Sequence, residues 1–206
     1  MFSSMKVAVV DDDKSARISL ARLIRTGGIQ VEDFSSAYEF LQDPVREQVD
    51  CAVSDVRMPG IDGFALQETL AQTLPHLSLV FVTGKGDIPM SVRAMKHGAI
   101  DFLEKPVKVG ALLDAIGRAV ERTRNQRILR AKLGDLQRRW DLLTARERQV
   151  FQLITSGLLN KQAGAELGAS EKTIKVHRAR VMSKMKAESL AELVRMAELL
   201  QFHAAK

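Results

Sequence analysis

The amino-acid sequence predicts an α/β fold, a doubly wound parallel sheet of five strands, followed by an all-α region. Over residues 1–120, short apolar runs alternate with amphipathic segments, as strands alternate with helices in such folds. Charge divides the chain at the same place. Residues 1–120 carry 13 Lys and Arg against 16 Asp and Glu, whereas residues 121–206 carry 18 against 9. Two domains, one acidic and one basic, are therefore expected within the 206 residues.

The expected elements of the first domain alternate along the chain. Strands are predicted at 6–10, 29–33, 51–54, 79–82 and 100–103, and helices at 14–26, 36–42, 64–73, 88–97 and 109–120. Gly27, Gly28 and Gly98 fit helix ends, because glycine takes the left-handed conformation at low cost. Five strands and five helices in this order predict a flavodoxin-like arrangement with strand order 2-1-3-4-5.

Residues 121–141 are predicted to form an arginine-rich helical linker that continues the last of these helices. Four apolar side chains recur at helical spacing, and a bend is expected at Gly134. The four are Leu129, Leu133, Leu136 and Trp140. A frayed, solvated linker is the alternative, since the apolar stripe is short.

Four short helices are predicted in residues 142–206. Two capping boxes, Thr144 with Glu147 and Ser189 with Glu192, would begin the first and the fourth helix. Glycines and small polar caps mark the inner boundaries: Gly157, Asn160, Gly168 and Ser170. Only two residues separate the second and third helices, which is the spacing of a helix-turn-helix.

Composition excludes several classes of protein. Cys51 is the single cysteine, so no internal disulfide can form and the cytoplasm is the expected location. No apolar run approaches the roughly 20 residues of a membrane span, and no signal peptide is recognised, so no membrane partner is expected. The histidines are scattered, which argues against zinc. The excess of basic residues in 121–206 favours nucleic-acid binding, although such a surface can also simply keep a protein soluble.

Reactive side chains stand at four of the expected strand ends. An acidic cluster (Asp11, Asp12 and Asp13) follows the first strand, Asp55 the third, Thr83 the fourth and Lys105 the fifth. The carboxyl ends of parallel strands converge on one crevice, where ligands bind. Crowded carboxylates repel one another and raise their pKa values unless a cation lies among them. Mg²⁺ (or Mn²⁺) is the expected cation, because it prefers oxygen ligands and often bridges to phosphate.

This site predicts phosphoryl transfer to an aspartate. Asp55 is the expected nucleophile, because it stands alone at its strand end and a carboxylate can form an acyl phosphate. Lys105 and the Thr83 hydroxyl would stabilise the developing negative charge. Asp12 is expected to hold the metal, and Asp11 to act either as a metal ligand or as an acid through water. Each residue also has an ordinary interpretation as a loop residue or as a helix cap.

Four motifs carry a family resemblance. They are Val-Val-Asp11-Asp12-Asp13, Ser-Asp55-Val-Arg-Met-Pro-Gly-Ile-Asp-Gly, Val-Thr83-Gly-Lys-Gly-Asp and Glu-Lys105-Pro106. With them, residues 5–120 resemble the receiver domain of bacterial two-component response regulators, and residues 1–120 are assigned to that domain. The resemblance implies that a sensor histidine kinase phosphorylates Asp55, and that Asp11, Asp12, Asp55 and the Arg57 backbone carbonyl hold the metal.

The resemblance also implies how the site would signal. Thr83 and Lys105 contact the phosphoryl group, and the peptide bond before Pro106 is usually cis. Phe102 matches an aromatic switch position, whose ring moves as Thr83 swings toward phosphate. Many members have Tyr at this position, whereas this chain has Phe102. No hydroxyl hydrogen bond can therefore report the switch here.

The third helix of the second region has one basic, accessible face. Ile174, Val181 and Met185 are expected to face inward. The opposite face then carries Lys172, Lys175, Val176 and Ala179. Long cations beside small residues suit a helix that enters the major groove of double-stranded DNA. The alternative is an ordinary solvated helix face.

Residues 142–200 resemble the LuxR-type helix-turn-helix, and residues 142–206 are assigned to a domain of this type. The resemblance implies that Lys175, Val176 and Ala179 reach bases. It also implies that a second group meets the DNA backbone or caps helices: Asn160, Lys161, Lys172, Thr173 and His177. Gly164 departs from the family pattern, and looser packing of the second helix is expected. Together, the two domains resemble the FixJ-type response regulators.

Three functions are compatible with these features. The first is a transcription regulator whose phosphorylation drives homodimerisation and DNA binding. RNA polymerase would be a further partner of this regulator. Its own phosphotransfer and autodephosphorylation would be its only enzymatic activities. The second is a phosphohydrolase of the haloacid dehalogenase class with Asp11 as nucleophile, but Ser15 fits that motif poorly. The third is a constitutive DNA-binding protein in which the receiver serves only for dimerisation.

Overall fold

The computed structural model describes residues 5–84 and 86–204, with side chains described as far as residue 200. The chain divides into two compact units, residues 1–127 and residues 128–206. The last long helix of the first unit continues into the second.

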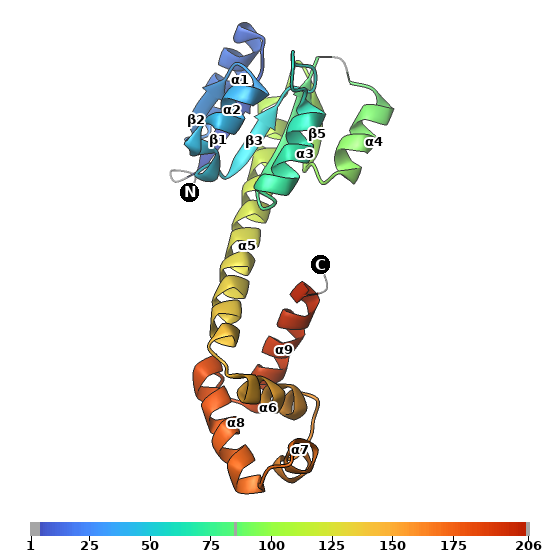
Figure 1. Cartoon of the computed structure of the whole chain (residues 1–206). Coiled ribbons are helices and arrows are strands. Elements are labelled where there is room, and N and C mark those ends of the chain that lie inside the picture. Colours follow the sequence, from blue (N-terminus) through green and yellow to red (C-terminus); the bar gives the residue numbers. More distant parts are fainter. Residues whose placement is uncertain (1–4, 85, 205–206) are drawn as a thin grey trace. The chain divides into compact units, whose positions relative to one another are not determined.

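The first unit is a parallel sheet with helices on both faces (Figure 1). Its strands are β1 (Lys6–Val10), β2 (Gln30–Phe34), β3 (Cys51–Ser54), β4 (Ser78–Thr83) and β5 (Asp101–Glu104). They lie in the order β2-β1-β3-β4-β5, which confirms the predicted flavodoxin-like arrangement. The ends of each strand lie within one residue of the predicted range.

The helices of this unit cover the two faces of the sheet unequally. They are α1 (Lys14–Thr26), α2 (Ala37–Gln42), the short 3-10 helix η1 (Pro44–Glu47), α3 (Gly63–Thr73), α4 (Ile88–Lys96) and α5 (Val109–Asp141). Apolar side chains of α1 and α5 pack on one face of the sheet, and those of α2, α3 and α4 pack on the other. Cys51 is fully buried in the apolar cluster that β3 forms with α1 and α5, and this burial raises the pKa of its thiol.

The strand register brings the carboxyl ends of the central strands level. Val10 lies opposite Ser54, and Ser54 lies opposite Phe81. Thr83, the last residue of β4, lies opposite Glu104, the last residue of β5. The residues that follow these strands therefore meet along one edge of the sheet, as the sequence predicted.

Helix α5 is unbroken from Val109 to Asp141, so residues 121–141 are helical throughout and Gly134 lies inside the helix. Near its end, Leu136 and Trp140 pack into the apolar core of the second unit. The Trp140 ring meets Phe151 nearly edge-on, with 5.0 Å between the ring centroids. Trp140 thus anchors this end of α5 by packing.

The second unit contains the four predicted short helices. They are α6 (Ala145–Thr155), α7 (Asn160–Leu167), α8 (Glu171–Met185) and α9 (Leu190–Ala204). The Thr144–Glu147 capping box forms as expected, and Ser170 caps α8. Ser189 also accepts from the Glu192 amide, but the Glu192 carboxylate accepts from the amide of Glu188 rather than from that of Ser189.

Asn160 does not cap α7, contrary to the prediction. The helix begins one residue earlier than a cap at Asn160 requires, so Leu159 occupies the cap position. Gln162 satisfies the exposed helix end instead, because its side-chain oxygen accepts from the Leu159 amide at 2.8 Å. The Asn160 side chain turns toward α8 and accepts from Arg178 at 3.3 Å.

Gly164 packs tightly, not loosely as expected. It is buried on α7, and a Cβ atom at this position would lie 2.7 Å from the Ala169 carbonyl oxygen in the turn before α8. The glycine therefore lets the two helices of the helix-turn-helix approach closely.

We expect Gly164→Ala to destabilise the second unit by about 1–3 kcal/mol, because the added methyl group meets backbone that must shift. Gly134→Ala is the matched control. A Cβ there meets only the end of the Arg138 side chain, so the higher helix propensity of alanine should stabilise α5 by about 0.5–1 kcal/mol. Urea unfolding of both variants measures the difference. Equal gains in stability would contradict the close approach at Gly164.

A buried carboxylate joins α6 to α8 in the same unit. Glu147 is 2% exposed, and its Oε2 accepts from Lys184 Nζ at 2.6 Å and from the Thr144 amide at 2.9 Å. Burial alone would raise the pKa of Glu147, but the hydrogen bonds from Lys184 and Thr144 outweigh it and lower that pKa below its ordinary value. The ionised form is therefore favoured in the folded state.

We expect Glu147→Gln to lower the free energy of unfolding by about 1–3 kcal/mol at neutral pH. Because the folded-state pKa is lowered, this contribution is complete above the unfolded pKa of about 4.3 and is lost as the pH falls through the folded value. The stabilities of wild type and variant should thus converge in acid, which urea unfolding at several pH values measures. Glu198→Gln, at an exposed position of α9, should change stability by less than about 0.5 kcal/mol.

Candidate functional site

Two acidic residues stand side by side at the ends of β1 and β3. The Asp11 amide donates to the Phe34 carbonyl at 3.1 Å, and the Asp55 amide donates to the Val10 carbonyl at 2.9 Å. These bonds extend the ladders of the sheet by one residue and fix both backbones. Asp11 and Asp55 are buried, although the ionised form of a carboxylate is costly to bury without a partner.

Lys105 supplies that partner from the end of β5. Its amide donates to the Thr83 carbonyl at 2.8 Å, which ties it to β4. Its Nζ reaches Asp11 Oδ2 at 2.6 Å and Asp55 Oδ1 at 3.3 Å. One ammonium group therefore bridges two carboxylates, and Asp11, Asp55, Thr83 and Lys105 meet at the same edge of the sheet.

The remaining carboxylate oxygens are oriented by backbone amides. Asp11 Oδ1 accepts from the Asp13 amide at 3.0 Å, and Asp55 Oδ2 accepts from the Arg57 amide at 2.9 Å. Arg17 on α1 donates to the Asp11 carbonyl at 2.6 Å and holds the same loop. Sequence reasoning missed Arg17, whose position one turn into α1 was the available signal.

The electrostatics of the site leave room for more positive charge. Burial raises the pKa of Asp11, although Lys105 and the Asp13 amide oppose this. Burial also acts to lower the pKa of Lys105, but the hydrogen bond to Asp11 and the two carboxylate charges raise it overall. Two buried carboxylates therefore share a single ammonium, and the pocket can accept further positive charge.

The structure does not bring all of the predicted metal ligands together. Asp12 is exposed and lines an open groove with Arg57 and Met90 rather than meeting Asp11 and Asp55. Within residues 5–84 and 86–200, no three His, Cys, Asp or Glu side chains are grouped closely enough to hold a metal. The predicted donors are nonetheless all oxygen atoms, the type that Mg²⁺ prefers.

The loop after Asp55 depends on a glycine that sequence reasoning assigned no role. The Gly63 amide donates to the Val56 carbonyl at 2.9 Å, and a methyl group at Gly63 would overlap the Asp55 carbonyl oxygen. The start of α3 therefore lies directly against the Asp55 backbone. The signal in the sequence was Asp62-Gly63, a helix cap followed by the smallest residue.

Two expectations from the family resemblance have structural counterparts. The Lys105–Pro106 peptide bond is cis. Phe102 is half-buried in β5, and its ring centroid lies 6.2 Å from that of Phe81.

In the second unit, α8 has the two faces that the sequence predicted. Ile174, Val181 and Met185 are buried. The exposed positions among the predicted DNA contacts are Lys161, Lys172, Thr173, Lys175, Val176 and Ala179. Two of these side chains interact with neighbours at the start of α8: Thr173 shares a hydrogen bond with Ser170, and Lys175 forms an ion pair with Glu171 at 3.1 Å.

The other two predicted DNA contacts, Asn160 and His177, are half-buried. His177 Nδ1 is buried without a hydrogen-bond partner among the described residues. No helix in the described part of the chain is long and apolar enough to cross a membrane.

Comparison with known proteins identifies both units. The family model for the response regulator receiver domain matches residues 7–117, and that for bacterial regulatory proteins of the luxR family matches residues 141–197. Nodulation protein W of Bradyrhizobium diazoefficiens is 47% identical over 96% of this chain and 87% of its own length. The transcriptional regulatory protein FixJ of Azorhizobium caulinodans is 43% identical over 97% of this chain and 94% of its own.

A solved structure supports the same relationship. The response regulator StyR has a TM-score of 0.82 at 47% identity, covering 95% of this chain and 98% of that one. The fold and both sites are thus those of a two-domain signalling protein that combines a receiver with a DNA-binding domain. The chain belongs to the response regulators of two-component systems that carry a LuxR-type helix-turn-helix.

Several coarse properties follow from this membership. The protein is a transcription regulator rather than a classical enzyme, with a histidine kinase and DNA as partners. Receiver domains bind Mg²⁺ at their acidic pocket.

Proposed function

We propose that Asp55 is the phosphoacceptor of this regulator. The contact of Lys105 with both Asp11 and Asp55 is the observation that carries this proposal. A carboxylate oxygen of Asp55 would attack phosphorus as the bond from phosphorus to the kinase histidine breaks, and the electron pair of that bond stays on the histidine nitrogen. Lys105 and Thr83 would donate to the phosphoryl oxygens.

Mg²⁺ (or Mn²⁺) would be held by Asp11, Asp12, Asp55 and the Arg57 carbonyl oxygen. When bound, the metal neutralises charge on the transferring group. Among these residues Asp12 has to turn inward from its exposed position. Hydrolysis of the acyl phosphate in the same pocket would reset the protein, so its own phosphotransfer and autodephosphorylation are the reactions that we assign to the receiver.

Phosphorylation would be read out on the face of α4. Thr83 would move toward the phosphoryl group and Phe102 would follow it. Three apolar side chains of α4 are exposed to solvent: Ile88, Val92 and Met95. Ile88 is 80% exposed. An exposed apolar patch of this kind suits an interface, and we assign it to a homodimer that forms on phosphorylation.

The dimer would bind two DNA half-sites at once, which raises affinity without new contacts. We assign base contacts to Lys175, Val176 and Ala179. We assign DNA-backbone contacts to Asn160, Lys161, Lys172, Thr173 and His177. The domain limits that we propose are 1–120 for the receiver, 121–141 for the linker and 142–206 for the DNA-binding domain. The cytoplasm is its proposed location, and RNA polymerase a further partner.

We expect Lys175→Ala to weaken operator binding by about 1–3 kcal/mol, because a long cation at the centre of the exposed face of α8 is lost. Titration of operator DNA by fluorescence anisotropy, with and without competitor DNA, measures the loss. Arg195→Ala, which removes an exposed cation of α9 outside the predicted contacts, is the control and should bind normally. Equal losses in the two variants would contradict a specific role for Lys175.

Sedimentation and operator binding, measured with and without beryllofluoride and Mg²⁺, test the whole proposal. The expected result is a monomer that becomes a dimer and binds its operator more tightly. Equal affinity in both states would favour the constitutive DNA-binding alternative. Multiple turnover of a phosphomonoester would favour the phosphohydrolase.

A further inference from the structure

Helix α5 holds the start of β3 through a partly buried ion pair, at the sheet edge opposite the acidic site. Asp50 immediately precedes β3, and its side chain is only 10% exposed. Arg127 pairs with Asp50 at 2.9 Å, and the same guanidinium donates to the Val49 carbonyl at 2.7 Å. Arg124, one turn earlier, lies 3.7 Å from the Asp50 carboxylate.

The same helix holds the start of β4. The Ser78 amide, at the first residue of β4, donates to the hydroxyl of Thr123 at 3.0 Å. Thr123 is fully buried on α5. The Gln126 amide lies 3.2 Å from the Pro75 carbonyl and 3.1 Å from the His76 carbonyl, and donates to both when its nitrogen faces them.

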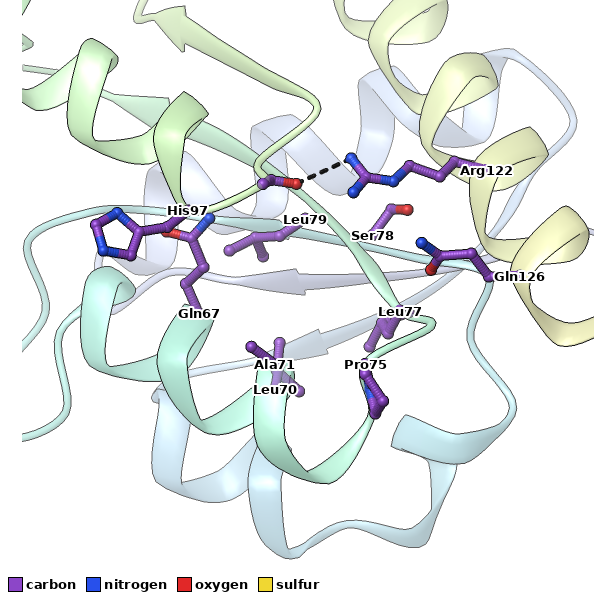
Figure 2. Close-up of a pocket in the computed structure, with 11 residues that line it drawn as sticks. Gln67, Leu70, Ala71, Pro75, Leu77, Ser78, Leu79, His97, Arg122 and Gln126 are labelled. Carbon is purple, nitrogen blue, oxygen red and sulfur yellow. Dashed lines mark hydrogen bonds between the residues drawn. The ribbon is translucent and has the colours of Figure 1, made fainter. Parts of the chain in front are cut away.

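The start of β5 is held in the same way. Arg122 donates to the Gly98 carbonyl at 3.2 Å, a bond that Figure 2 shows as a dashed line. Arg118 pairs with Asp101, the first residue of β5, at 2.5 Å. Figure 2 also shows Arg122 and Gln126 extending from α5 to a pocket that they line together with Ser78 at the start of β4.

That pocket, of about 80 Å³, suits ordered water better than a ligand. Two of the polar side chains that line it already donate to backbone carbonyls, Gln67 to that of Ala94 and Arg122 to that of Gly98. The Ser78 hydroxyl is buried with no hydrogen-bond partner among the described residues, and a water molecule would complete it.

Each strand held by α5 at its start delivers a residue of the acidic site at its end. β3 (Cys51–Ser54) lies between Asp50 and Asp55, and β4 runs from Ser78 to Thr83. β5 begins at Asp101 and is followed directly by Lys105. At a rise of about 3.3 Å per residue, roughly 13–17 Å separate the residue held at each strand start from the site residue at the strand end. β3 and β4 are buried along their whole length, and packed interiors transmit strain rather than absorb it.

We propose that Asp50, Thr123 and Arg127 are positioning residues of the phosphorylation switch. They hold residues 122–127 of α5 against the strand starts, so that a displacement of Asp55 and Thr83 on phosphorylation reaches the helix that continues into the DNA-binding unit. This inference rests on the proposed function of Asp55. Besides the readout on α4, the signal would then have a second route, which runs through the strands to α5.

Asp50→Asn is the decisive variant, because it removes the charge that holds Arg127 while leaving Asp55, Lys105 and Thr83 in place. Phosphate incorporation from acetyl phosphate should be unchanged. Beryllofluoride should alter amide exchange in residues 121–127 of the wild type, and this difference should be lost in the variant. The gain in operator affinity on activation should fall by about threefold or more.

Two further variants complete the experiment. Asp114→Asn makes the same chemical change at an exposed position of α5 and should behave as the wild type. Arg127→Lys keeps the positive charge but loses the planar set of guanidinium donors, so it should retain part of the gain in operator affinity. If Asp50→Asn fails to fold, Arg127→Lys serves as the test in its place.

A full gain in operator affinity in a folded Asp50→Asn or Arg127→Lys protein would overturn the inference, whatever the change in basal exchange. The proposed function fails by a different result: a wild type that takes up no phosphate or shows no gain on activation.

Discussion

Asp55→Asn is expected to abolish phosphate incorporation from acetyl phosphate or a kinase. The amide keeps the size of the carboxylate and can still accept from the Arg57 amide, but it lacks the nucleophilic carboxylate oxygen. The fold should persist, because Lys105 keeps its shorter contact with Asp11 at 2.6 Å. Radiolabelled phosphate uptake, with thermal unfolding in parallel, separates loss of chemistry from loss of structure.

Asp62→Asn is the matched control for this variant. Asp62 lies in the same loop, is exposed, and caps α3 by accepting from the Ala65 amide at 2.8 Å. Asparagine caps helices about as well as aspartate, so labelling should be retained. Undiminished labelling of the Asp55→Asn protein would show that Asp55 is not the phosphoacceptor.

Lys105→Ala is expected to slow phosphate incorporation by about 10²–10³-fold, the usual effect of removing one donor to a developing negative charge. Metal affinity should move in the opposite direction. Without the ammonium, Asp11 and Asp55 repel each other more strongly, and a dication becomes their best partner. Single-turnover rates measured across a Mg²⁺ titration give both quantities.

Lys108→Ala, an exposed cation three residues later, is the control and should match the wild type in both measurements. Slower transfer accompanied by weaker Mg²⁺ binding in Lys105→Ala would mean that Lys105 mainly supports the local structure. Slower transfer with equal or tighter Mg²⁺ binding would identify it as the donor to the phosphoryl group.

Local patterns were sufficient to predict the sheet and its reactive edge. Short apolar runs located all five strands, and the side chains that follow them were expected to converge because parallel strands end together. The contacts of Lys105 with Asp11 and Asp55 are consistent with that expectation. The roles of these residues in phosphoryl transfer and metal binding remain predictions.

Other features could not be predicted, because they depend on contacts between distant residues. The pair of Asp50 and Arg127 joins positions 77 residues apart, and no local pattern records it. The tight approach at Gly164 depends on where the next turn places the Ala169 carbonyl. Strand periodicity also does not specify that Asp12 is exposed while Asp11 and Asp55 are buried. Sequence patterns therefore located the elements, whereas tertiary geometry decided which side chains meet.

The burial of Cys51 has a practical consequence for experiments on this protein. Its thiolate is strongly disfavoured inside β3, and maleimides or iodoacetamide react with the thiolate. Cysteines introduced on α4 or α8 can therefore carry fluorophores or spin labels in the natural background, without first replacing the native one. Any slow alkylation at Cys51 itself then reports how often the centre of the sheet opens to solvent.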